Sequence, residues 1–145
     1  KWLAGMMLVV LALLPTVVYA LSVYQLGNPV GNLDLGSTLG SYLGLLFLAS
    51  AYLSLSLFTS AITDNPIVAF VLGMLLSLIF YAGFDQLASL DALKSQSLLV
   101  LNLGISEHYT SISRGVVDSR DVVYFVGLTC VSLAAARTAL QSRNW

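Results

Sequence analysis

The chain has 145 residues, of which 58% are hydrophobic and 9% charged, and its formal net charge is −1. Soluble domains average roughly 25% charged residues, so this composition and a mean hydropathy of +0.90 exclude an ordinary soluble domain and predict an integral membrane protein. The near-neutral balance, without a Lys or Arg cluster, argues against nucleic acid as a partner and against a polybasic lipid-binding surface.

A single lysine and a long apolar run open the chain. The run is longer than the apolar part of a secretory signal peptide and only one charge precedes it, so we interpret it as a membrane span. Position 1 is not a methionine. We therefore expect a processed product or a fragment whose upstream sequence is missing.

The first predicted span covers residues 2–24, which at about 1.5 Å per residue cross a hydrocarbon core of about 30 Å with some tilt. Pro15 is expected to kink this helix, because proline removes one backbone hydrogen bond and frees the carbonyl group one turn earlier. We expect neighbouring protein or a hydroxyl group such as that of Thr16 to compensate for the lost bond.

A turn-rich connection at residues 25–38 leads to the second predicted span, residues 39–61. Ser37 or Thr38 is expected to cap this helix. Glycine recurs at every fourth position around its start, a spacing that lets another helix backbone approach closely, so we predict a helix-packing face. The glycines of this first stripe are Gly36, Gly40 and Gly44. Three serines farther along either hydrogen-bond across helices or bond back to their own helix: Ser54, Ser56 and Ser60.

Asn65 and Pro66 form the sharpest helix start in the chain. Asparagine is a favoured N-cap, and proline at the first helical position gives up only an N–H that would have no partner in the helix. We predict a tight hairpin here, followed by a third span at residues 66–84. A second stripe of small residues is also predicted to pack against a helix, and the sequence leaves open whether the two stripes face each other. The second stripe consists of Ala69, Gly73 and Ser77.

The most polar part of the chain is the stretch 85–121, which holds eight of the thirteen charged residues and the only histidine. Its apolar portion is too short to cross a bilayer. Residues 88–103 therefore suit an interfacial or re-entrant helix on the outer face, with apolar side chains at the membrane surface and Asp91 and Lys94 in water.

Asp118 and Asp121 mark the start of a last span at residues 122–140. Asp118 matches an N-cap, Asp121 lies three residues farther on, and both acids stand at the positive end of the helix dipole. Arg114 and Arg120 lie within about one helical turn of these acids, so we expect them to pair.

The polar residues before the last span are the candidate site. Glu107 and His108 are the only acid and base worth naming together, either as a proton or substrate contact at the membrane face or, as we favour, as a solvated pair in a loop. We interpret the whole outer-face polar cluster as a structural helix cap rather than a cargo contact. It consists of Glu107, His108, Arg114, Asp118, Arg120 and Asp121.

Four spans place both termini on one side of the membrane. The basic residues divide equally between the two sides, so the positive-inside rule alone does not choose between them. Arg114 and Arg120 each have an acid nearby that can neutralise them, which favours the side of the termini as cytoplasmic.

The sequence contains no catalytic signature. It has no phosphate-binding glycine loop, no Cys or His cluster with metal-ligand spacing and no nucleophile with a plausible base, so we expect no enzymatic activity, cofactor or metal. The lone Cys130 lies in the last apolar segment and is expected to behave as a small hydrophobic residue. Because the first three predicted spans carry no charge, a proton- or sodium-coupled transporter is disfavoured.

Several segments resemble a known family. The run from Ile112 to Phe125 (ISRGVVDSRDVVYF), followed by an apolar helix and the tail SRNW, looks like the C-terminal part of the type-two ABC exporter permeases. It is most similar to the GldF-type permease subunits associated with gliding motility in Bacteroidetes. Residues 24–34 (YQLGNPVGNLD), 40–42 (GSY) and 63–70 (TDNPIVAF) are similar too, so the resemblance covers nearly all of the chain. These motifs mark the type of subunit and not its cargo.

The resemblance implies a single permease domain over residues 1–145, with the third to sixth spans of a six-helix permease and a helical excursion on the outer face before the last span. It implies a bacterial inner-membrane protein with both ends of this chain in the cytoplasm. Its partners would be an ABC ATPase subunit and a second permease subunit. The first two helices and the coupling element on which the ATPase acts are absent from this sequence. The alternative is a non-transporting membrane scaffold of a motility or secretion complex.

Overall fold

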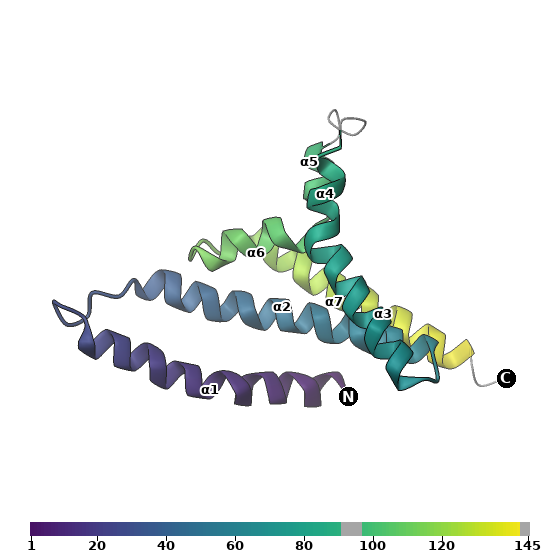
Figure 1. Ribbon diagram of the computed structural model, residues 1–145, viewed down its shortest axis with the longest axis horizontal. Coiled ribbons are helices and arrows are strands. Elements are labelled where there is room, and N and C mark those ends of the chain that lie inside the picture. Colours follow the sequence, from purple (N-terminus) through teal and green to yellow (C-terminus); the bar gives the residue numbers. More distant parts are fainter. Residues whose placement is uncertain (91–96, 143–145) are drawn as a thin grey trace.

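The computed structural model describes residues 1–90 and 97–142, and this part of the chain is helical throughout, without a strand (Figure 1). The elements are α1 (Trp2–Leu26), α2 (Leu35–Ile62), α3 (Pro66–Leu78), a π-helical turn η1 (Ile79–Gly83), α4 (Phe84–Ala88), α5 (Ser97–Leu101), α6 (Ile105–Ser113) and α7 (Ser119–Ser142). Four helices are long and apolar enough to cross a membrane, namely α1, α2, the continuous helix Pro66–Ala88 and α7. The predicted all-helical membrane bundle with four spans is confirmed.

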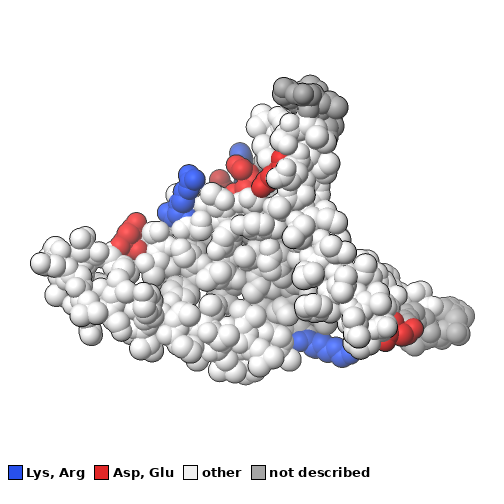
Figure 2. All heavy atoms as spheres, viewed as in Figure 1, with Lys and Arg blue, Asp and Glu red and all other residues white. Residues whose placement is uncertain are grey.

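The bundle is built around α2, which packs against α7 along its length. α3 crosses the second half of α2, α6 lies along its first half, and α1 packs against α2 while burying none of its own residues. α1 begins and α7 ends at the same end of the bundle, as four spans require (Figure 1). Figure 2 shows the charged side chains at the edges of this view, with a broad uncharged surface between them, which suits a chain embedded in lipid.

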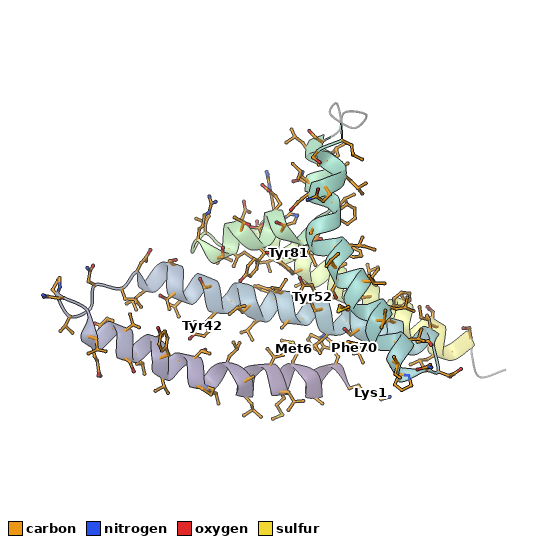
Figure 3. All side chains as sticks on the ribbon, viewed as in Figure 1. Lys1, Met6, Tyr42, Tyr52, Phe70 and Tyr81 are labelled. Atoms are coloured by element: carbon orange, nitrogen blue, oxygen red, sulfur yellow. The ribbon has the colours of Figure 1, made fainter. Side chains whose placement is uncertain are left out.

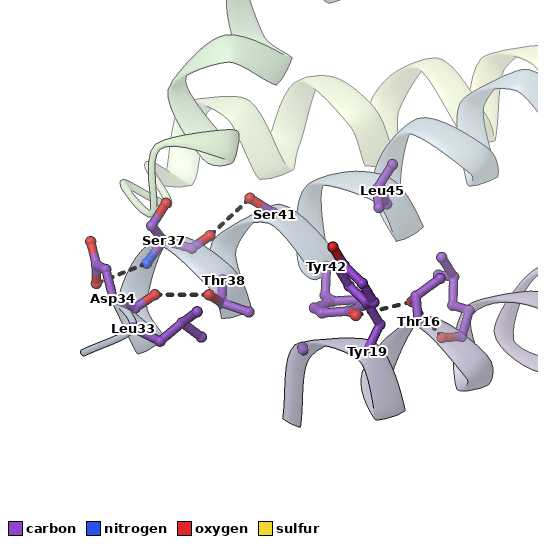
Figure 4. A pocket seen from close by; sticks show the side chains of 11 residues that line it. Thr16, Tyr19, Leu33, Asp34, Ser37, Thr38, Ser41, Tyr42 and Leu45 are labelled. Atoms are coloured by element: carbon purple, nitrogen blue, oxygen red, sulfur yellow. Dashed lines mark hydrogen bonds between the residues drawn. The ribbon is translucent and has the colours of Figure 1, made fainter. Parts of the chain in front are cut away.

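Local capping chemistry explains where α2 and α3 begin. Asn65 caps α3 as predicted, because its Oδ1 accepts hydrogen bonds from the backbone N–H groups of residues 67 and 68. The expected cap of α2 by Ser37 or Thr38 is wrong. Asp34 caps it instead, accepting from the N–H groups of residues 36 and 37 at 3.0 and 3.2 Å, so α2 starts at Leu35 (Figure 4).

Pro15 lies inside α1, which continues to Leu26. The hydroxyl of Thr16 donates to the carbonyl oxygen of Leu13 at 2.6 Å and not to that of Leu11, which stands one turn before the proline. The expected local compensation by Thr16 is therefore wrong. The same hydroxyl accepts a hydrogen bond from the Tyr42 hydroxyl at 2.9 Å and so ties α1 to α2 (Figure 4).

The segment between the third and fourth spans differs most from its prediction. The helix expected at residues 88–103 is not observed as one element: the third span ends at Ala88, α5 is a single short turn, and the positions of Asp91 and Lys94 lie outside the described residues. The helix that packs into the bundle is α6, where a loop was expected. Ile105 and Ile112 of α6 are fully buried with Ala51 of α2 and Phe125 of α7, so α6 forms half of this core cluster.

Candidate functional site

A buried histidine–aspartate pair joins α6 to α7. His108 lies in the first turns of α6 and Asp121 in the first turn of α7. The His108 Nδ1 atom lies 2.7 Å from Asp121 Oδ1, and the two side chains are only 13% and 9% exposed. The acid that His108 contacts is therefore Asp121, thirteen residues farther along the chain, and the favoured interpretation of His108 as part of a solvated loop pair with Glu107 is wrong.

The second ring nitrogen of His108 determines which protonation states this pair can adopt. Nε2 lies 3.0 Å from the backbone carbonyl oxygen of Asn102. A carbonyl oxygen only accepts, so this hydrogen bond requires a proton on Nε2. A second proton then lies between Nδ1 and Oδ1, either on the ring, giving an imidazolium–carboxylate ion pair, or on the acid, giving a neutral pair.

Aromatic rings connect the pair to the core. The ring of Tyr124 stacks on that of His108, with centroids 4.1 Å apart and planes inclined by 20°. The Tyr124 hydroxyl donates to the carbonyl oxygen of Leu103 at 2.6 Å, one residue beyond the carbonyl that His108 contacts. Tyr124 also meets Phe125 edge-to-face, and Phe125 stacks on Phe47 of α2. The imidazole is therefore held by a hydrogen bond at each nitrogen and by a ring on one face.

The second carboxylate oxygen of Asp121 takes no part in the contact with His108. This atom, Oδ2, is buried and has no hydrogen-bond partner within the described part of the chain. Leaving a buried polar atom unpaired costs free energy, and such atoms in native structures call for a functional or structural explanation. Asp121 can therefore accept one further hydrogen bond or a proton without giving up its contact with His108.

The remaining polar residues of the cluster lie outside this buried pair. Glu107, Arg114 and Arg120 are exposed. Asp118 precedes α7, and its Oδ1 accepts a hydrogen bond from the backbone N–H of Arg120 at 3.0 Å, as a cap does. That hydrogen bond lowers the pKa of the Asp118 carboxyl. The two acids of the predicted helix start thus have different roles, because Asp118 caps α7 and Asp121 binds His108 rather than an arginine.

The first glycine stripe forms the surface on which α6 rests. A Cβ atom on Gly40 would lie 2.5 Å from the Cα of Gly115 and 2.7 Å from the carbonyl oxygen of Ile112, both backbone atoms that cannot move aside cheaply. Gly44 faces the side chains of Ile112 and Tyr109, and the backbone of Gly36 lies against Gly115. This stripe lets α6 and the turn that follows it approach the α2 backbone.

The second stripe packs elsewhere, so the two stripes do not face each other. A Cβ atom on Gly73 would meet Thr59 and Ser56 in the second half of α2, and the Thr59 hydroxyl donates to the carbonyl oxygen of Ala69 at 3.1 Å. Ser54 bonds back to its own helix at 2.7 Å. Ser56 and Ser60 line an open groove of about 280 Å³, whose α3 wall includes the three residues of the second stripe, Ala69, Gly73 and Ser77.

Within residues 1–90 and 97–142, no three His, Cys, Asp or Glu side chains come close enough together to hold a metal ion. No protein-family model, curated protein sequence or solved structure matches the chain.

Proposed function

We propose that the chain is the membrane-embedded part of a permease subunit of an ATP-driven ABC export system in a bacterial inner membrane, linked to gliding motility or secretion and energised by a separate ATPase subunit. In this proposal both termini are cytoplasmic, and the end of the bundle that carries α6 faces outward. The chain performs no chemistry on its cargo.

The observation that carries the proposal is the packing of α6 against α2. The resemblance to type-two ABC exporter permeases implies a helical excursion before the last span, and α6 is a helix of that kind, packed on Gly40 and Gly44 between the third and fourth spans. α6 covers one end of the α2–α7 pair, where its Ile105 and Ile112 are buried. An element that packs at one end of a transporter can act as a gate in alternating access.

The serines of α2 provide a second line of support. A permease should line its transport path with polar groups, such as serine hydroxyls that face an opening. A scaffold could instead pack the same face of α2 against protein without water. Ser56 and Ser60 are exposed and line the groove between α2 and α3. They are available to a path formed with a second permease subunit, which favours the permease over the scaffold.

The test is whether ATP hydrolysis depends on this chain. The full-length protein, expressed with its candidate ATPase and purified together from membranes into nanodiscs, should give magnesium-dependent, vanadate-sensitive ATP hydrolysis. Gly40→Leu should reduce that activity, because the new side chain displaces α6. The matched control is Gly127→Leu in α7, where a Cβ atom meets nothing within 4 Å and activity should be retained.

Two outcomes would contradict the proposal. A stable complex whose ATP turnover is the same with Gly40→Leu as with the parent would assign the chain to the scaffold class. The absence of any associated ATPase in a preparation that is monodisperse and folded would exclude the permease outright.

A further inference from the structure

The end of the bundle where α1 begins and α7 ends holds a pocket of about 360 Å³ between α1, α2 and α7. Two basic side chains line it, Lys1 from the start of α1 and Arg137 from the last part of α7, together with the polar groups of Ser60 and Gln141. Figure 3 shows Lys1 at the end of α1 on the side where α7 ends, and Figure 2 shows basic atoms at the lower edge of that region. The pocket thus collects positive charge from opposite ends of the sequence.

An apolar groove adjoins this pocket. The groove has a volume of about 410 Å³, and Trp2 and Leu133 line both spaces, so they form the wall that the two spaces share. Beyond them the groove is lined mainly by apolar side chains of α1, α2 and α7, Phe47 and Val126 among them. The Trp2 indole N–H donates to the carbonyl oxygen of Ser50 at 3.4 Å, which holds the ring at the junction.

Among the described residues that line the pocket, none carries a negative charge. Neither Lys1 nor Arg137 has an ion-pair partner among residues 1–90 and 97–142. Asp64, an acid of the same end of the bundle, lies in the turn between α2 and α3 and is not part of the lining. A partner with a negative group is therefore favoured at the mouth of the pocket.

We infer that this composite site binds a phospholipid with an anionic headgroup. Its phosphate lies between Lys1 and Arg137, and one acyl chain runs past Trp2 into the apolar groove. The reason is the order of polarity across these two adjoining spaces, with cations and polar groups in the pocket and apolar side chains in the groove beyond Trp2 and Leu133, which is the order of groups in a lipid. Basic pockets between membrane helices recognise lipid headgroups in this way. The site is independent of the proposed transport function.

The test uses Trp2 as a reporter. In a background in which Trp145 and any tryptophan outside these 145 residues are replaced by phenylalanine, Trp2 is the only tryptophan, and its fluorescence is quenched by an acyl chain that carries bromine and lies against it. The full-length protein is reconstituted in nanodiscs of phosphatidylethanolamine and phosphatidylglycerol, with the brominated chains on one lipid and then on the other. If lipids contacted Trp2 at random, each brominated lipid would quench Trp2 fluorescence in proportion to its mole fraction. We expect the brominated phosphatidylglycerol to quench Trp2 more than this.

Substitutions of Lys1 and Arg137 then test whether these two side chains cause the preference for phosphatidylglycerol. Lys1→Gln or Arg137→Gln should lower the preference for phosphatidylglycerol roughly fivefold each, the effect of one basic residue at a membrane surface. Arg137→Lys keeps the charge and should retain most of the preference. The matched control removes two positive charges at the other end of the bundle, with Arg114→Gln and Arg120→Gln. The preference for phosphatidylglycerol should be the same in this control as in the parent.

Equal quenching by the two brominated lipids, or an unchanged preference in the Lys1→Gln, Arg137→Gln double variant, would overturn the inference. Addition of glycerol phosphate distinguishes the source of the anion. If it removes the preference at concentrations comparable to the lipid, the site recognises a free phosphate compound and the lipid assignment is wrong. If the preference persists, the acyl chain in the groove contributes to binding as inferred.

Discussion

The two ends of the bundle differ in their contacts and in the charge of their open spaces. At the end that carries α6, which we call the closed end, helices meet through backbone contact at Gly40 and through the short His108–Asp121 hydrogen bond. At the end where α1 begins and α7 ends, which we call the terminal end, Lys1 and Arg137 line an open pocket. A pocket of about 390 Å³ between α1 and α2 is also present at the closed end, but no basic residue lines it. Substitutions at the closed end should therefore change stability, and those at the terminal end should change lipid preference.

The largest effect is expected from Gly40→Leu. A Cβ atom there would already come within 2.5 Å of the Gly115 backbone, so α6 must move away. We expect a loss of about 3 kcal/mol, the upper part of the usual range for overpacking. Thermal unfolding in detergent measures it, with Gly127→Leu as the control. An unchanged melting temperature would mean that α6 does not pack on this stripe in solution.

The His108–Asp121 pair should come next. Asp121→Ala leaves His108 Nδ1 buried without a partner, and we expect a loss of about 1–3 kcal/mol. Asp121→Asn keeps an oxygen acceptor and should cost less. A double-mutant cycle with His108→Gln measures the coupling between the two residues, which should be at least about 0.5 kcal/mol. Additive single effects would show that the two side chains do not interact.

A smaller effect is expected at Asp118. Asp118→Asn keeps the capping oxygen and should be nearly silent, whereas Asp118→Ala removes it and should lower the melting temperature slightly. Because the pKa of Asp118 is lowered in the folded protein, its charge contributes stability above the unfolded value of 3.8, and this contribution is lost as the pH falls through the folded value. The difference between parent and Asp118→Asn should therefore vanish in strong acid. If Asp118→Asn abolished activity in a protein that still assembles, the residue would belong to a cargo path.

The terminal end should be the least sensitive in stability. Lys1→Gln and Arg137→Gln remove exposed charges without ion-pair partners in the described part of the chain, so the melting temperature in lipid-free detergent should not change. In the presence of phosphatidylglycerol the parent should gain more thermal stability than the double variant, because a ligand that binds only the folded state stabilises it. Equal gains in thermal stability for the parent and the double variant would mean that phosphatidylglycerol acts at another place on the protein.

Local signals in the sequence determined the spans and two of the helix starts, at Asn65 and at Asp118. Long uncharged runs have no alternative to membrane helices, since a bilayer satisfies no backbone hydrogen bond from outside. The cap at Asn65 was predictable because a cap involves only residues within one turn. Asp34 offers the same chemistry, but the hydroxyl residues that follow it are favoured cap residues too, so residue type alone does not choose among them. α6 differs from the expected loop because Ile105, Tyr109 and Ile112, which recur at helical spacing, stand among polar residues.

Which residues of these elements contact each other is determined only by the tertiary structure. The first glycine stripe was visible in the sequence, but its contact with Gly115 depends on how the chain returns after α6. Glu107 is adjacent to His108 in sequence, yet successive residues of a helix point in different directions, and the turn after α6 brings Asp121 to the imidazole instead. Lys1 and Arg137 form no cluster in the sequence and line one pocket only because the start of α1 and the last part of α7 both lie beside α2. Spans follow from the free energy of transferring each segment into lipid, whereas these contacts follow from the packing of one segment against another, which the local sequence does not encode.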